Sequence, residues 1–308
     1  MTKWKIADAH CDTLFSIGVA NRDPQSLQVT ADRLKAGNVC VQTLAMFAGG
    51  KGPAGEPYKK AVAMLENREK VGVKIYEGAL PEEMPEAPGA VLSIEGGEIL
   101  EGSITRLDEF HARHHIRLIA LTWNNENEIA YPSAKDGPGL KPFGLHLLRE
   151  MDARGVCADV SHLSEKGFWD VIDHAALPPV ASHSNYKPLC NIHRNLTKEQ
   201  VKAIIEKNGF IGINFYTHFL VEQGEATLED AMRHIDAIME LGGENVLGFG
   251  SDFDGIESWP EGLNDPSYLP AFCDLLLQRG YTQAQVEKIA GGNYWRLLKQ
   301  AEAAATIK

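Results

Sequence analysis

The sequence lacks any long run of apolar residues, and positive charge is in the minority. No stretch approaches the ~18 apolar residues that a membrane-spanning helix needs, so we expect no such helix. Lysine and arginine number 30 against 42 aspartate and glutamate residues, which gives a net charge of −12 at pH 7. An acidic chain without a basic stripe is not expected to bind nucleic acid or an anionic membrane, and we interpret the charge as a contribution to solubility.

Cysteine is also scarce, and none of it occurs in closely spaced pairs. The chain has 5 cysteines among 308 residues, at widely separated positions. An odd number of scattered cysteines is typical of free thiols in a reducing compartment. Residues 1–8 include two lysines but lack the apolar segment of a secretory signal, so we expect a cytoplasmic location.

The chain does contain a regular alternation of short apolar runs and longer amphipathic segments. Apolar residues make up 44% and charged residues 23%, which are ordinary values for a globular protein. Apolar runs of this length are typical of strands that are covered on both faces. Residues 73–77 are a candidate for an additional short strand. We expect eight main strands, at residues 5–10, 39–46, 90–95, 116–122, 156–161, 179–183, 210–215 and 246–251.

Amphipathic patterns between these strands predict helices. Thr197 and Thr282 each precede a glutamine by three residues, which is the capping-box pattern of a helix start. An apolar stripe over residues 230–241 predicts a helix that ends at Gly242, because glycine readily adopts a left-handed conformation. Further helices are expected at residues 59–70, 104–114, 143–154, 165–175 and 284–304.

Strands that alternate with helices are expected to be parallel and joined by right-handed crossovers. Eight such units favour a (β/α)8 barrel of the TIM type, as a single α/β domain over residues 1–308 with helices at its C-terminal end. An open, doubly wound sheet is the alternative. The loop at residues 48–57 is rich in glycine and proline but too short to separate two domains, so we expect a mobile loop on the barrel rim.

Histidines and carboxylates follow five of the expected strands. The active sites of such barrels lie at the C-terminal ends of the strands, so these side chains are expected to converge. Imidazole and carboxylate are ligands of zinc and similar divalent ions, and one carboxylate can bridge two ions. The six residues are His10 and Asp12 after the first strand, Glu95 at the end of the third, His162 after the fifth, His183 at the end of the sixth, and Asp252 after the eighth.

Each of these residues alone has an ordinary structural explanation. A buried histidine more often satisfies a local hydrogen bond than it binds a metal, and Asp12 alone is compatible with a turn or a helix cap. Their joint placement at one rim would then require six independent coincidences. His193 and His218 follow the sixth and seventh strands and are candidates for substrate contact, whereas we expect His234 to be structural.

Seven short segments of the chain are ADAHCDT (7–13), SIEGGE (93–98), DVSHLS (159–164), ASHSN (181–185), HRNLT (193–197), INFY (213–216) and GFGSDFDG (248–255). Together they resemble the membrane (renal) dipeptidases and their bacterial relatives, the M19 zinc peptidases. One such segment alone is weak, but seven in the family's order are specific. They cover the chain from residue 7 to about residue 255, and the helical tail is also similar.

The resemblance implies a barrel that holds two zinc ions. It identifies His10 and Asp12 as ligands of one zinc ion. It identifies His162 and His183 as ligands of the other, with Glu95 as the bridge between the two ions. Because the relatives are metallohydrolases, the resemblance also implies a catalytic function for this centre.

The resemblance further implies functions for residues that do not hold the metal. Asp252 matches the acidic residue that moves protons. Arg194 matches the arginine that binds the substrate carboxylate, a task that suits its planar guanidinium. Relatives often carry a histidine after the fourth strand, where this chain has Trp123, Asn124 and Asn125. Trp123 and Asn124 are therefore candidates for substrate binding, with Asn124 or Asn125 as a donor to the oxyanion.

The implied reaction is hydrolysis of dipeptides by a metal-bridging hydroxide, and the acceptance of dipeptides that end in a D-residue is left open. Asp252 would act as general base and then as general acid. An amidohydrolase acting on N-acyl amino acids or cyclic amides is the first alternative, because the same centre would serve it. A non-catalytic metal-binding protein is less favoured, because neither Asp252 nor Arg194 is needed to hold the metal. The expected partner is a dipeptide, and a homodimer is left open.

Overall fold

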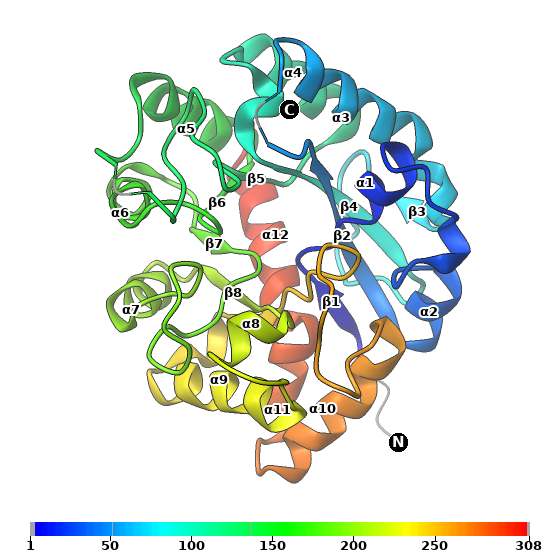
Figure 1. The fold of residues 1–308 in the computed structure, drawn as a ribbon. Helices are drawn as coiled ribbons and strands as arrows, with labels where there is room; N and C mark the ends of the chain where they lie inside the picture. The colour runs from blue at the N-terminus through cyan, green and yellow to red at the C-terminus, as the bar shows by residue number, and fades with distance from the viewer. Residues whose placement is uncertain (1–3, 51, 136, 307–308) are drawn as a thin grey trace.

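The computed structural model describes residues 4–50, 52–135 and 137–306, in which eight parallel strands close into a barrel (Figure 1). The neighbours follow the order β2-β1-β9-β8-β7-β6-β5-β4, and pairing between β2 and β4 closes the ring. This closure confirms the (β/α)8 barrel and excludes the open sheet. The strands are β1 (Ile6–Asp8), β2 (Val39–Phe47), β4 (Gly89–Glu95), β5 (Leu118–Ala120), β6 (Cys157–Asp159), β7 (Val180–Ala181), β8 (Phe210–Ile213) and β9 (Leu247–Phe249).

The additional strand β3 (Lys74–Ile75) pairs in parallel with the start of β4 and lies outside the ring. It falls within the extra strand expected at residues 73–77. The eight main strands also lie where the sequence predicts them, although most are shorter than their apolar runs. Residues 1–3 and 307–308 lie outside the described residues, so the bounds 1–308 of a single domain stay a prediction.

The helices surround the barrel, as Figure 1 shows. Thr197 and Thr282 form the expected capping boxes, and Gly242 follows α9 in a left-handed conformation with φ 95°. The expected helix at 284–304 is interrupted by a π-helical turn at Lys288–Gly292. The helices are α1 (Thr13–Gly18), α2 (Ala31–Ala36), α3 (Glu56–Asn67), α4 (Ile104–His114), α5 (Pro142–Arg154), α6 (Glu165–His174), α7 (Lys198–Glu206), α8 (Thr217–Leu220), α9 (Leu228–Glu240), α10 (Leu269–Gln278), α11 (Gln283–Glu287) and α12 (Asn293–Ala304).

Helix α12 covers the N-terminal end of the barrel and crosses behind the ring of strands in Figure 1. Its apolar residues, including Tyr294 and Leu298, pack in one cluster with Val41 and Phe210 from the strands. The Tyr294 hydroxyl also lies 2.6 Å from the Thr43 hydroxyl inside the barrel. With this end closed by packing, the opposite end carries the polar side chains.

The part of loop 48–57 that the structure describes lies on the rim of the barrel, as expected. A Cβ added to Gly50, which has φ 85°, would come within 2.4 Å of the Asn125 amide nitrogen. The loop therefore contacts the segment that follows β5. Residue 51 of this loop lies outside the described residues. None of the helices in the described ranges has the length and apolarity that crossing a bilayer requires.

Candidate metal centre

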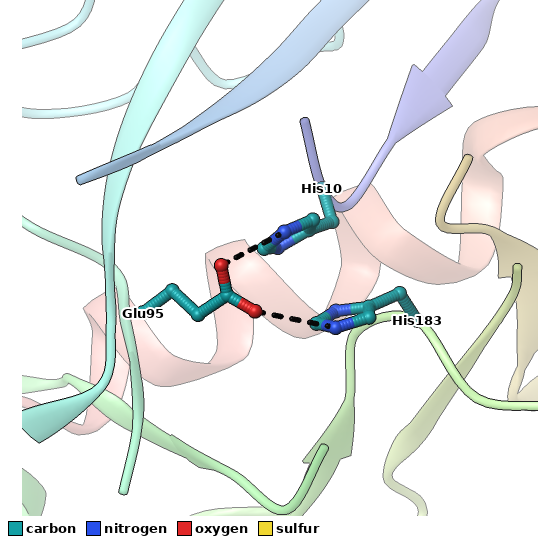
Figure 2. Close-up of side chains that lie close together, drawn as sticks. All are labelled: His10, Glu95 and His183. Atoms are coloured by element: carbon teal, nitrogen blue, oxygen red, sulfur yellow. Dashed lines mark ion pairs between the residues drawn. The ribbon is translucent and has the colours of Figure 1, made fainter. Parts of the chain in front are cut away.

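The Glu95 carboxylate, at the end of β4, lies among three imidazoles. Figure 2 shows it between His10 and His183, which follow β1 and β7. Glu95 Oε2 is 3.5 Å from His10 Nε2. Glu95 Oε1 is 3.5 Å from His183 Nε2 and 3.1 Å from His162 Nε2. The two carboxylate oxygens thus face different histidines, which is the arrangement that a bridging ligand requires.

Two further carboxylates approach His10 from other directions. His10 Nε2 lies 3.6 Å from Asp12 Oδ2 and 3.8 Å from Asp252 Oδ1. Ligand atoms lie within 4.8 Å of one another in two groups, His10 with Glu95 and His183, and His10 with Asp12 and Asp252. All the side chains are buried, so a cation here would be bound largely by protein groups. The structure therefore brings together all six residues that the sequence places at this rim.

The hydrogen bonds around His162 and His183 leave the Nε2 atoms of the two rings unprotonated and facing each other. His162 Nδ1 lies 2.8 Å from the Asn124 amide oxygen, which only accepts, so the proton of neutral His162 sits on Nδ1. The Ser182 hydroxyl donates to Asp159, so it accepts from His183 Nδ1 at 2.7 Å. Both Nε2 atoms then carry lone pairs, yet they are 3.0 Å apart. A shared cation would remove this repulsion.

Unpartnered polar atoms at the same place also fit a cation. His10 Nε2 and Asp12 Oδ1 are buried and have no hydrogen-bond partner in the described structure. Buried polar atoms are nearly always paired, because an unpaired one loses its hydration without compensation. Imidazole nitrogen and carboxylate oxygen are the ligand atoms that zinc and related divalent ions take. The residues present therefore fit a metal centre.

The pKa shifts of the site residues also fit a bound cation. Burial, with the Arg194 charge as the next cause, lowers the pKa of His162 to about 4. Burial and the neighbouring Glu95 raise the pKa of Asp12, and burial also raises that of Asp252. Burial lowers the pKa of His10, but the charges of Glu95 and Asp12 outweigh it, so that pKa lies well above its ordinary value. Carboxylates with raised pKa values beside the neutral imidazole of His162 are stabilised by added positive charge.

Two buried aspartates hold the ends of the ligand-bearing strands. Asp8 in β1 accepts hydrogen bonds from Ser251 N at 2.9 Å and Gln42 Nε2 at 3.1 Å, and so ties the end of β1 to the segment after β9. Asp159 in β6 accepts from Ser161 N at 2.9 Å and Ser182 N at 3.0 Å. Sequence reasoning missed both functions, although both aspartates stand inside the quoted segments ADAHCDT and DVSHLS.

The backbone at two site residues adopts a conformation that is uncommon outside glycine. His162 and Asp252 both have φ 66°, and each lies three residues after the end of a short strand, β6 and β9 respectively. A left-handed non-glycine residue costs free energy, so it persists where surrounding contacts hold it. At Asp252 these contacts include its own N–H, which donates to His10 O at 3.2 Å. Gly255 is required nearby, because a Cβ there would lie 2.0 Å from Asp12 Oδ2.

Arg194 lies in the loop after β7, beside the histidines but without an acidic partner. Its Nη2 donates to His183 O at a long 3.4 Å, and its guanidinium lies 5.2 Å from the Phe219 ring centre. Its Nε has no partner, and the side chain forms no ion pair with any described residue. Burial lowers its pKa to about 10, so it stays charged near neutral pH. Arg194 is thus a buried, unneutralised cation beside the candidate centre.

The structure places the remaining candidates at different distances from the centre. Asn124 contacts His162 directly, as described above, and so orients a ligand candidate. Trp123 lies farther out, with its ring centre 4.9 Å from that of Phe47 and 6.3 Å from that of His162. His193 lies 2.9 Å from the Ser133 hydroxyl at the mouth of the site. His218 lines a different pocket.

The family comparison agrees with this geometry. Residues 1–307 match the family described as membrane dipeptidase (peptidase family M19). The chain belongs to this family. An uncharacterized protein in the pqqA 5′ region of Klebsiella pneumoniae is 38% identical over 68% of this chain and 80% of its own length. An uncharacterized dipeptidase of Schizosaccharomyces pombe is 31% identical over 70% of this chain and 53% of its own length, so the chain matches about half of that relative.

Solved structures of M19 relatives share the whole fold. A metallopeptidase from Rhodobacter sphaeroides, liganded with a phosphinate mimic of the dipeptide L-Ala-D-Ala, superposes with a TM-score of 0.87. It is 26% identical and matches 97% of this chain and 99% of its own. The M19 dipeptidase AC has a TM-score of 0.89, 26% identity and the same coverage. As an M19 member, this chain is a peptide-bond hydrolase of a metal-dependent family.

Proposed function

We propose that the protein is a zinc-dependent dipeptidase with two zinc ions per chain. The observation that supports it is the position of Glu95, whose two oxygens face His10 on one side and His162 and His183 on the other. His10 and Asp12 would hold one ion, and His162 and His183 the other. When bound, such ions lower the pKa of a shared water to about 7 and polarise the scissile carbonyl.

In the proposed reaction, Asp252 would move the proton. Its Oδ2 accepts a hydrogen bond from Asn214 Nδ2 at 2.8 Å, which fixes the carboxylate. Its Oδ1 faces the centre, 3.8 Å from His10 Nε2. A carboxylate in this position can take a proton from the nucleophile and deliver it to the leaving amine. Asn124, through its contact with His162, positions that ligand.

In the same proposal, Arg194 would bind the C-terminal carboxylate of the substrate. It is buried, carries a positive charge and has no acidic partner among the described residues. A bidentate pair with a carboxylate would satisfy both its charge and its free N–H groups. Because Arg194 lies so close to His183, the substrate must end near the scissile bond, which selects dipeptides. Trp123, beyond His162, would contact the other part of the substrate.

The Rhodobacter sphaeroides relative binds a mimic of L-Ala-D-Ala, and we propose that this chain also accepts a C-terminal D-residue. A cytoplasmic location and a homodimer stay predictions from the sequence. The decisive experiment is a panel of L,L and L,D dipeptides, N-acyl amino acids and cyclic amides with purified, zinc-loaded protein. Hydrolysis of the dipeptides with about two zinc ions per chain supports the proposal. Turnover of N-acyl amino acids or cyclic amides without turnover of dipeptides would overturn it.

A further inference from the structure

A cavity of about 570 Å³ opens directly beside the candidate centre. His162 and Arg194 both line it, so it is continuous with the place where a substrate would react. Its size falls within the range of small-molecule pockets, roughly 300–1,000 Å³. The rest of its wall comes from the loop after β5, the start of α6, and the loop between β7 and α7.

The charges that line this cavity are mostly positive, in contrast to the whole chain. Lys135, Lys166 and Lys187 join Arg194 in the lining, and Glu165 is the one acidic residue there among those described. No ion pair within the described residues involves any of the three lysines. We call this cavity the basic pocket. In a chain of net charge −12, four cations around one cavity that form no ion pair with a described residue indicate an anionic ligand.

Lys187 is the best-placed of the three lysines, because it shares a braced loop with Arg194. Its backbone N–H donates to Leu196 O at 2.8 Å, and Leu196 N in turn donates to Asn185 O at 2.8 Å. These bonds hold the two ends of the loop together on either side of Arg194. Lys187 is half-buried, whereas Lys135 and Lys166 are exposed at the mouth of the pocket.

The opposite wall of the pocket is also fixed to the centre. Ser133 N donates to His162 O at 2.6 Å, and the Ser133 hydroxyl lies 2.9 Å from His193 Nδ1. In addition, α6 and α7 both begin at the pocket, at the caps Ser164 and Thr197. The N-terminal ends of helices carry partial positive charge, which adds to the field of the lysines.

We propose that the basic pocket binds a second carboxylate of the substrate, so that the enzyme prefers dipeptides with aspartate or glutamate at the C-terminal position. This inference rests on the proposed function, in which Arg194 holds the main-chain carboxylate. The side-chain carboxylate of the same residue is only a few bonds away, and Lys187 lines the same cavity as Arg194. Lys135 and Lys166 add attraction at the mouth. A neutral side chain of the same shape would lack this electrostatic attraction to the lysines.

The test compares pairs of substrates that differ in charge but hardly in shape. With zinc-loaded protein, kcat/KM for Ala-Asp and Ala-Glu should exceed that for Ala-Asn and Ala-Gln by about tenfold, for both the L- and the D-form of the second residue. High salt should reduce the preference, because it screens exposed charges. Dipeptide hydrolysis with equal or greater activity on the amide side chains would overturn the inference and leave the proposed function standing.

Variants then assign the preference to the pocket. Lys187→Met should lower the ratio of Ala-Asp to Ala-Asn activity several-fold, and Lys187→Arg should largely retain it. Lys198→Met is the matched control, since Lys198 is an exposed lysine of the same region that does not line the pocket. An unchanged ratio in Lys187→Met, or an equal drop in the control, would contradict the assignment.

Calorimetric binding of Ala-Asp and Ala-Asn to the metal-loaded protein separates the two proposals. Tighter binding of Ala-Asp without hydrolysis of any dipeptide would support the basic pocket and overturn the dipeptidase function. Equal binding of the two dipeptides would overturn the inference, whatever the enzyme hydrolyses.

Discussion

Replacing Arg194 with methionine should remove the ability to distinguish a dipeptide from its C-terminal amide. Arg194 is 5% exposed and lacks an acidic partner among the described residues, so a substrate carboxylate would meet a desolvated charge. Truncating one member of such a buried pair typically costs ~2–5 kcal/mol. At about 1.4 kcal/mol per factor of ten, kcat/KM for Ala-Ala should fall roughly 30-fold to several thousand-fold.

The same substitution should lower kcat/KM for the dipeptide amide, Ala-Ala amide, much less. Ala-Ala amide has no carboxylate to pair with Arg194, so the wild-type enzyme already lacks this interaction and should hydrolyse it poorly. Measuring kcat/KM for both substrates with both proteins gives a thermodynamic cycle whose coupling term is the carboxylate interaction. The methionine side chain keeps the length of the arginine stem, and its packing against Phe219 tests the purely structural function of the residue.

Two controls make this result decisive. Thermal unfolding of Arg194→Met, followed by circular dichroism, establishes that the variant is folded at the assay temperature. Arg194→Lys keeps the charge but not the planar pair of donors, and it should recover only part of the lost activity. Equal losses on the acid and the amide would refute the reasoning, because they would mean that Arg194 supports the fold and does not contact the substrate carboxylate.

Three further expectations can be tested separately. Asp252→Asn should retain the bound zinc by elemental analysis but lose ~10²–10⁴-fold in kcat, and near-normal turnover would remove it from proton transfer. His162→Ala should lower the zinc content from about two ions per chain to about one, and an unchanged content would exclude it as a ligand. His234 Nδ1 accepts from Tyr186 N at 3.1 Å and its Nε2 lies 3.0 Å from Leu220 O, so the folded protein holds the ring neutral. Burial lowers its pKa to about 4 from the ordinary 6.5, so urea stability should be constant above about pH 6.5 and fall as the pH decreases towards 4. His234→Gln should show a smaller decrease, and an identical pH profile would contradict this cause.

The strands and the site could be predicted because both follow from short-range patterns and one topological rule. Each barrel strand is an apolar run, as with FIGI at 210–213, and parallel strands end at one rim. Polar residues at those ends, such as His10 and Glu95, must then meet. The short helices α1 and α8 were not expected, because 6 and 4 residues are too few to establish a helical period.

The contacts that orient the ligand candidates could not be predicted, because they join residues that are far apart in sequence. Asn124 and His162 come from different strand ends, and nothing local in NNEN indicates that one amide oxygen will fix a histidine tautomer. The sequence hypothesis gave Asn124 a contact with substrate. The structure shows a hydrogen bond to His162, and a direct substrate contact stays a prediction.

Asp8 and Asp159 show how the barrel makes one site from distant segments. Asp8 ties the end of β1 to the segment after β9, so it positions His10 and Asp252 together. Asp159 ties the ends of β6 and β7, so it positions His162 and His183 together. Each pair is thus held by its own aspartate. Glu95 on β4 contacts a member of each pair, His10 in one and His162 in the other. The two pairs are joined on one side of the ring through β8, whereas the β2–β4 pairing closes the other side. Glu95 therefore depends on closure of the barrel to contact His10 as well as His162.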